Sequence, residues 1–199
     1  MQPNQAVPMM EGDAICSTTN APEEDVDLNQ ISLRPIDLSD LDDVMLWSTD
    51  DKVAKYCTWE PHTSKEDGIN FIQNIASKSL WFRAICLHNR AIGCIDLLSS
   101  SGQRRCRDKS AELGYALGSR YWGKGIATQV VKQVVKAAFS YFPHLERLEA
   151  LVDVENVGSQ RVLEKAGFQR EGILRKYVFV KGKSRDMVMF SFLSNGAQF

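Results

Sequence analysis

The sequence predicts a mixed α/β fold of the α+β class: one domain with a central mixed, mostly antiparallel sheet flanked by helices. Segments with apolar residues at alternating positions, typical of strands, are interspersed with segments whose apolar residues recur at helical spacing. Several predicted strands are joined by short turns and others by a helix, so the sheet must be mixed. The chain has 199 residues, 44% hydrophobic and 25% charged, enough to bury one ordinary core.

The first predicted strand, residues 31–36, contains Pro35, which indicates a sheet edge or the end of the strand. Two amphipathic helices follow, separated by a looser region at residues 58–64. Their apolar stripes are Leu38, Leu41, Val44 and Met45 in the first and Ile69, Phe71, Ile72 and Ile75 in the second. Strands at residues 80–87 and 91–97 are then joined by His88-Asn89-Arg90 as a tight hairpin.

The second half is predicted to contain a polar loop, a strand, a long helix, a strand, a short helix and two final strands. These elements cover residues 100–110, 111–117, 126–141, 148–153, 157–166, 169–179 and 185–193. In the strand at 111–117, Leu113, Tyr115 and Leu117 face one side, and Glu112, Gly114 and Ala116 face the other.

The two ends of the chain differ from the middle. Residues 1–29 contain acidic side chains but no Lys or Arg, unlike a signal or transit peptide. We predict a disordered acidic tail at residues 1–29, the folded domain at residues 30–194 and a C-terminal tail at residues 195–199.

Composition excludes several classes of function. A net charge of −1 does not favour nucleic acid or an anionic membrane, and no apolar run approaches the length of a membrane span. The five cysteines form no CxxC pair and no cluster with His, so no metal site is predicted. An odd cysteine count without a secretion signal indicates a reducing compartment, most simply the cytoplasm, with a nuclear share left open.

Two glycines, Gly123 and Gly125, stand between a predicted strand and the long helix. Glycines here let the main chain approach a ligand, and the N-terminus of the helix adds unpaired N–H groups and a positive dipole. A pyrophosphate is the expected occupant, although spacing alone also fits a plain turn. The Walker A pattern matches as far as Lys124, but Gly125 stands where a Ser or Thr should bind Mg²⁺, and the third glycine of a Rossmann fingerprint is missing.

In this context, Arg120-x-x-Gly123-x-Gly125 resembles the acyl-CoA motif, Q/R-x-x-G-x-G/A, of the GNAT superfamily of N-acetyltransferases. The resemblance is to the RimJ/RimL-type branch, covers residues 30–194 and rests on separated motifs in the right order. Those motifs are Leu33-Arg34-Pro35, AELGYAL at 111–117, GKGIAT at 123–128, Asn156-Val-Gly-Ser159, EKAGF at 164–168 and Glu171-Gly172.

The resemblance implies an acyltransferase that moves acetyl from acetyl-CoA to a primary amine by direct attack in a ternary complex. Pantetheine would pair with the exposed strand before the motif, where a main-chain N–H would stabilise the oxyanion. The implied cofactor contacts are Tyr115, Ala116, Leu117, Arg120, Trp122, Gly123, Lys124, Gly125, Ile126, Ala127, Thr128 and Asn156.

Glu112 is the candidate general base, acting directly or through a water, because the amine arrives protonated. The alternatives are a surface carboxylate or one that only anchors the ammonium. For the leaving thiolate, many family members use a Tyr on the short helix, but the region near Val162 offers no hydroxyl. The branch pattern makes Ser159 the candidate acid, or a hydrogen-bond donor to sulfur, and Asn156 a cofactor-orienting amide. Both could also be an ordinary helix cap.

The acceptor stays open. Weaker candidates on the acceptor side are Trp59, Glu60, His62, Tyr177 and Asp186. The branch favours a protein or peptide N-terminus over a polyamine or other small amine. A non-catalytic acyl-CoA-binding or protein-interaction module on the same fold is the alternative function, and the oligomeric state is not predicted.

Overall fold

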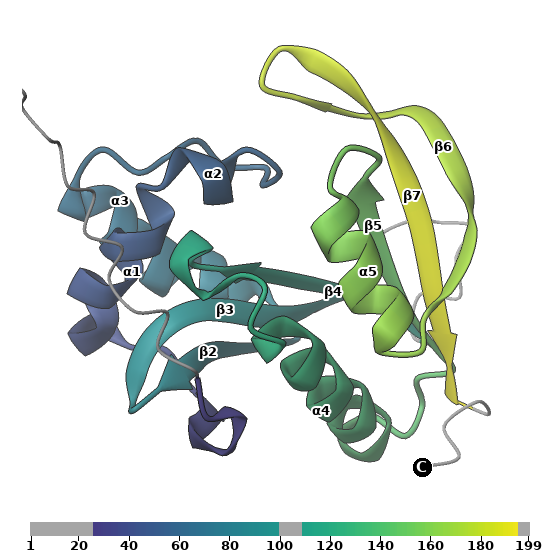
Figure 1. Ribbon diagram of the computed structural model, residues 1–199, viewed down its shortest axis with the longest axis horizontal. Coiled ribbons are helices and arrows are strands. Elements are labelled where there is room, and N and C mark those ends of the chain that lie inside the picture. Colours follow the sequence, from purple (N-terminus) through teal and green to yellow (C-terminus); the bar gives the residue numbers. More distant parts are fainter. Residues whose placement is uncertain (1–25, 100–108, 195–199) are drawn as a thin grey trace, which may run out of the picture.

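The computed structural model describes residues 26–99 and 109–194, which form one twisted sheet with helices on both faces (Figure 1). The strands, in the order β1-β2-β3-β4-β5-β7-β6, are β1 (Ile31–Arg34), β2 (Trp81–Leu87), β3 (Arg90–Ser99), β4 (Ser110–Leu117), β5 (Arg147–Asp153), β7 (Lys183–Leu193) and β6 (Gln169–Val180). Each strand runs antiparallel to its neighbours except at the parallel pair β4 and β5. The predicted mixed, mostly antiparallel sheet is therefore confirmed.

The helices are α1 (Leu41–Ser48), α2 (Asp51–Ala54), α3 (Lys65–Asn70), α4 (Ile126–Tyr141) and α5 (Val157–Lys165). Short 3-10 or π-helical turns are η1 (Leu28–Gln30), η2 (Leu38–Asp40), η3 (Phe71–Ile75), η4 (Ala76–Lys78) and η5 (Ser119–Tyr121). The predicted acidic tail up to residue 25, residues 100–108 of the predicted loop and the C-terminal tail lie outside the described residues.

The observed strands differ from the predicted ones at their ends. β1 is an edge strand, as Pro35 indicated, but it ends at Arg34, two residues before the end of the predicted strand. Between β2 and β3, His88 and Asn89 adopt positive φ angles of 50° and 64°, as in two-residue hairpin turns, and Arg90 already belongs to β3. β7 begins two residues earlier than predicted, because Lys183 pairs with Val180 across another two-residue turn.

α2 was not predicted, and the region before residue 58 was given no regular structure. With four residues, α2 is too short for an apolar repeat to appear in the sequence. It is instead defined by its cap, where the Asp50 carboxylate accepts a hydrogen bond from the Lys52 main-chain N–H at 2.9 Å.

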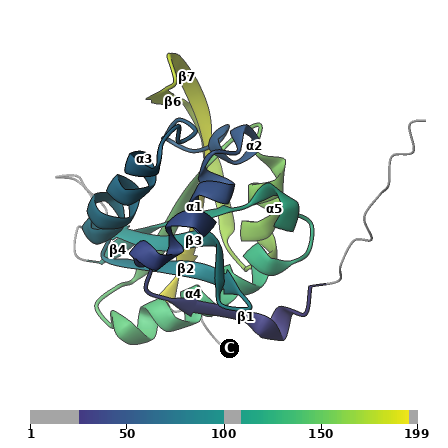
Figure 2. The same ribbon diagram turned by 90° about the vertical axis from the view of Figure 1, so that its left-hand side faces the viewer.

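The sheet separates two apolar cores. α4 and α5 pack on one face against Leu113 and Leu117 of β4, whereas α1 and η3, the turn that follows α3, pack on the other, where Ala116 lies. Figure 2 shows α2 and α3 on one side of β2, β3 and β4 and α4 on the other. The two-sided pattern predicted for the strand at 111–117 is thus confirmed, and it decides which face each β4 side chain can reach.

Candidate active site

β4 and β5 diverge (Figure 1), and the open edge that β4 leaves beyond their last paired residues, called the gap below, forms the centre of the candidate site. The two strands pair in parallel only from Ser110 with Arg147 to Glu112 with Glu149. Beyond Glu112 the pairing ends and the strands diverge. The last five residues of β4 therefore have no strand paired with them on the β5 side. A ligand can occupy the place of the missing strand and pair with main-chain groups there.

The main-chain groups of Tyr115 point into this gap. The Gly118 N–H donates to the Ile92 carbonyl at 2.9 Å, which shows that even-numbered residues near this end of β4 bond to β3. Main-chain groups alternate in direction along a strand, so the N–H and C=O of Tyr115 are directed away from β3. The Leu117 carbonyl, directed the same way, accepts a hydrogen bond from the Trp122 indole N–H at 2.7 Å.

The predicted phosphate turn lies at the wide end of the gap. Gly123 and Gly125 both have positive φ angles, 77° and 80°, in the left-handed region that glycine tolerates best. A Cβ at Gly123 would meet no atom within 4 Å, so the main chain there faces open space. Gly125 is the N-cap of α4 and, as a glycine, has no side chain to cap the N–H groups of the first turn. Those N–H groups suit an external anion.

The other predicted contacts in this region occupy the turn or the first turn of α4: Trp122, Lys124, Ile126, Ala127 and Thr128. Ile126 is 1% exposed and anchors the helix start in the core, so its main chain alone can face a ligand. Trp122 is 46% exposed and tied to β4 through its indole N–H.

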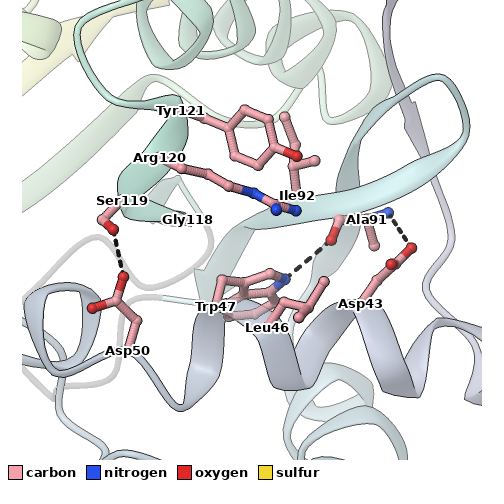
Figure 3. Close-up of a pocket in the computed structure, with 10 residues that line it drawn as sticks. All are labelled: Asp43, Leu46, Trp47, Asp50, Ala91, Ile92, Gly118, Ser119, Arg120 and Tyr121. Carbon is pink, nitrogen blue, oxygen red and sulfur yellow. Dashed lines mark hydrogen bonds between the residues drawn. The ribbon is translucent and has the colours of Figure 1, made fainter. Parts of the chain in front are cut away.

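The N-cap of α2 holds the segment before the turn, and α1 holds the start of β3 beside it (Figure 3). The Ser119 hydroxyl donates to the Asp50 carboxylate, and the Trp47 indole N–H donates to the Ala91 carbonyl at 3.2 Å. These groups line a cavity of about 100 Å³ between α1 and the segment. The Arg120 guanidinium also lines it and stacks on the Tyr121 ring, 4.8 Å from its centroid. The side chain of Arg120 is therefore occupied next to α1, and its cofactor contact stays a prediction.

Tyr115 joins the two sides of the gap. Its hydroxyl lies 2.6 Å from the Ser159 Oγ at the start of α5. Burial raises the pKa of Tyr115 to about 12, so the phenol stays protonated near neutral pH. Its one proton can be donated to Ser159 Oγ or to the Ser159 carbonyl oxygen 3.3 Å away. Sequence reasoning assigned Tyr115 only a main-chain role and missed this contact, because a strand residue and a helix residue 44 positions apart share no local pattern.

Asn156 caps α5, since its side-chain oxygen accepts the Ser159 N–H at 3.1 Å. The capping interpretation of the Asn156/Ser159 pair is thus confirmed. It leaves the Ser159 hydroxyl directed to Tyr115 and the Asn156 amide nitrogen available to other partners. The proposed roles of the two residues toward a cofactor stay predictions.

Glu112 is half-buried at the point where β4 and β5 separate, on the face opposite α4 and α5. A second carboxylate, Asp96 of β3, lies on the same face, because Asp96 pairs directly with Gly114. Burial raises the pKa of Asp96 to about 6, the Ser79 hydroxyl opposes that rise and the nearby Glu112 charge adds to it. Sequence reasoning missed Asp96, which stands as a lone acid in an apolar strand; that isolation was the available signal.

The rim of this face is formed by the α2 region and the tip of the β6–β7 hairpin. The Lys181 ammonium at the tip donates to the Ala54 carbonyl at 2.8 Å and lies 3.5 Å from the Glu60 carboxylate. Arg185 of β7 lies 3.3 Å from the Asp153 carboxylate and 3.6 Å from that of Glu155. Glu60, Asp153 and Glu155 on this rim therefore each face a cation.

The aromatic candidates of the acceptor side are largely structural. Trp59 packs on Trp47 with ring centroids 6.3 Å apart, and the His62 ring lies 5.4 Å from that of Trp59. Burial lowers the pKa of His62, which favours a neutral ring.

Asp186, another candidate of the acceptor side, accepts the Lys176 main-chain N–H at 2.7 Å in a bulge of β6.

No group of three or more His, Cys, Asp or Glu side chains in residues 26–99 and 109–194 could hold a metal ion. In the same ranges, no helix is long and apolar enough to cross a membrane.

Comparison with known proteins identifies the fold and its family. Residues 30–169 match the family model described as an acetyltransferase (GNAT) domain. The chain is 32% identical to an uncharacterized N-acetyltransferase, p20, of Bacillus licheniformis, covering 82% of this chain and 93% of that protein. It is 26% identical to the spermidine N(1)-acetyltransferase of Escherichia coli K12, over 80% of this chain and 84% of the relative. A GNAT-family acetyltransferase of Bacillus anthracis superposes with a TM-score of 0.73 at 26% identity, over 83% and 96% of the two chains.

Proposed function

Because the chain belongs to the RimJ/RimL-like group of the GNAT acetyltransferase family, we propose that it transfers acetyl directly from acetyl-CoA to a primary amine in a ternary complex. As a GNAT enzyme it is an acyltransferase that uses acetyl-CoA, which removes the non-catalytic module from consideration. The observation that carries the proposal is the gap beside β4, with a glycine turn and helix N-terminus at its wide end and a carboxylate on the opposite face.

The cofactor would lie on the α4 and α5 face. Its pyrophosphate would accept hydrogen bonds from main-chain N–H groups around Gly123 and Gly125 at the start of α4. Pantetheine would continue along β4 and pair with the main chain of Tyr115 and its neighbours. The thioester carbonyl would then reach the Tyr115 N–H, which would donate a hydrogen bond to the oxyanion as the amine attacks.

The two proton movements would occur on opposite faces of the sheet. On the acceptor face, Glu112 would receive the ammonium or take its proton, directly or through a water. On the cofactor face, the C–S bond breaks as the amide forms, and Ser159 would donate a hydrogen bond to the departing sulfur. The free thiol then takes one proton, and a second proton is released to water.

The acceptor we propose is the α-amine of a peptide or protein N-terminus. An enzyme for polyamines, such as the spermidine N(1)-acetyltransferase relative, must hold a substrate with several positive charges. Here the rim carboxylates Glu60, Asp153 and Glu155 already face Lys181 or Arg185. A rim of balanced charge suits a substrate with one ammonium and an extended neutral chain. A polyamine or other small amine is the second candidate.

The cofactor site is tested by Gly123→Asp against Gly123→Asn. Both side chains have the same size and strain the same positive φ, so the pair differs in charge alone. We expect Asp to weaken binding of CoA about 100-fold relative to Asn, because a carboxylate would stand where the pyrophosphate binds. Isothermal calorimetry measures the difference, and equal affinity of the two variants would refute the site.

The acceptor is tested by release of CoA thiol with a panel of peptides and small amines, followed by mass spectrometry of the products. We expect acetylation at peptide α-amines. Turnover of spermidine with no turnover of any peptide would overturn the proposed acceptor while leaving the cofactor site intact.

A further inference from the structure

We propose that Asp96 of β3 is a catalytic residue that takes the proton from the acceptor ammonium, with Glu112 as its partner carboxylate. The inference rests on the proposed function and adds a residue to it. Asp96 lies beside the main chain that would hold the thioester.

Gly114 brings the Asp96 carboxylate close to β4. The two residues are direct partners in the β3–β4 ladder, and a Cβ built on Gly114 would lie 2.5 Å from Asp96 Oδ1. Any larger residue at 114 would push the carboxylate away. The next residue, Tyr115, directs its N–H into the gap, so the carboxylate and the proposed oxyanion donor belong to consecutive positions of one strand segment.

The surroundings hold the carboxylate without neutralising it. The Ser79 hydroxyl, which follows η4, donates to Asp96 Oδ2 at 3.1 Å, and Oδ1 lies over Gly114. Among the described residues, the charge of Glu112 on β4 raises the pKa of Asp96. The charge of Asp96 in turn raises the pKa of the buried Cys94 thiol on the same strand. An arriving ammonium would therefore meet two carboxylates, Asp96 and Glu112, on this face of the sheet.

Glu112 is a diagonal neighbour of Asp96 on the same face, two positions along β4 from Gly114. Its negative charge and the burial of Asp96 both raise the pKa of Asp96, to about 6. A base with a pKa close to the working pH is more effective than an ordinary carboxylate, because it is ionised and still binds a proton well. Glu112 thus attracts the ammonium and strengthens Asp96 as the base.

The ammonium gives one proton to Asp96, and the neutral amine attacks the thioester carbon, forming the C–N bond. The intermediate loses its remaining excess proton as the C–S bond breaks, and the sulfur leaves as the thiol. Asp96 returns its proton to water before the next turnover.

The experiment compares Asp96→Asn and Glu112→Gln by the pH dependence of kcat/KM, with the best acceptor of the amine panel. In the parent enzyme we expect activity to fall below a pH near 6. Asp96→Asn should lose about 100-fold in kcat and lose this fall, with activity instead rising with pH as free amine becomes available. Glu112→Gln should keep the fall and move it to lower pH, since one charge that raises the pKa of Asp96 is gone.

Asp42→Asn is the matched control, because the Asp42 carboxylate lies on the solvent side of α1 and is paired with Lys65 of α3. It should behave as the parent does. Calorimetry with CoA and thermal unfolding show whether Asp96→Asn is folded and binds the cofactor. If it does and keeps the parent's pH profile while Glu112→Gln loses it, Glu112 is the base and the inference is wrong. Absence of thiol release by the parent with every amine would instead refute the proposed function.

Discussion

The main chain and the side chain of Tyr115 point to different parts of the gap. Its N–H is directed into the space left by β5, where the thioester is proposed to lie. Its hydroxyl crosses to α5 and bonds to Ser159 Oγ at 2.6 Å. A serine hydroxyl that accepts from a phenol keeps its own proton for another acceptor. Tyr115 would thereby direct the Ser159 proton toward the leaving sulfur, as a positioning residue.

Tyr115→Phe tests this arrangement because it removes one oxygen and leaves the main chain unchanged. We expect kcat to fall about 10-fold, the size of one lost hydrogen bond in the transition state, with little change in affinity for CoA. Steady-state kinetics and calorimetry measure the two quantities.

Ser159→Ala provides the companion variant. If Tyr115 acts on the sulfur only through Ser159, Tyr115→Phe should lower kcat little further once Ser159 is replaced by Ala. Independent, additive losses would show that Tyr115 does not act through Ser159.

The limits of sequence reasoning at single residues follow from distance along the chain. Glu112, Asn156 and Ser159 were proposed from motifs whose residues lie close together in the sequence. Asp96 was missed because only its pairing with Gly114 reveals its position. Strand pairing is a tertiary property, and a lone acid in an apolar strand predicts no partner.

The C-terminal strands are held to the rest of the sheet by a charged group that spans three strands. Arg147 of β5 donates two hydrogen bonds of 2.7 Å to Glu171 of β6, and Ser191 of β7 donates another at 2.6 Å. The fork of the guanidinium matches the carboxylate, which makes this pair stronger than a single-contact surface pair. The group lies where β6 meets β7, below the part of the hairpin that reaches the rim.

Glu171→Gln should change how stability depends on pH. Hydrogen bonds from Arg147 and Ser191 lower the pKa of Glu171 from its ordinary 4.5 to about 2. The folded state therefore favours the carboxylate, and this contribution is fully present above pH 4.5 and lost as the pH falls through 2. We expect the parent to lose stability more steeply than the variant across that range, and to be the more stable protein at neutral pH.

Thermal unfolding at a series of pH values measures this difference, and Glu66→Gln, on the exposed surface of α3, is the control. Parallel curves for parent and Glu171→Gln between pH 4.5 and 2 would contradict the proposed linkage.

Element prediction succeeded where a pattern was long. The apolar positions of α4 repeat over 16 residues, and its bounds match the prediction. α2 has four residues and was missed, and the bulge of β6 between Leu174 and Val178 left no sign in the sequence. A bulge is a mismatch between two strands, so neither strand alone contains the information.

The arrangement of the two faces makes a prediction about the kinetics. The phosphate turn and Ser159 belong to the α4 and α5 face, whereas Glu112 and Asp96 belong to the other. Both substrates would bind together, one from each side of the gap, with no acetyl group on the protein. Initial rates with varied acetyl-CoA and amine should give intersecting reciprocal plots. Parallel plots, the sign of a covalent intermediate, would contradict direct transfer.

The amino-acid order alone was sufficient for the fold class, the glycine turn and the family, because each depends on local periodicity or on residues a few positions apart. The gap between β4 and β5, the Tyr115–Ser159 contact and the Asp96–Glu112 pair required the folded chain. Each joins segments that are separate in sequence, and they become neighbours only when strand register and helix packing bring them together. The proposed peptide acceptor likewise rests on the assembled rim, where cations from the C-terminal hairpin meet carboxylates of the α2 region and β5.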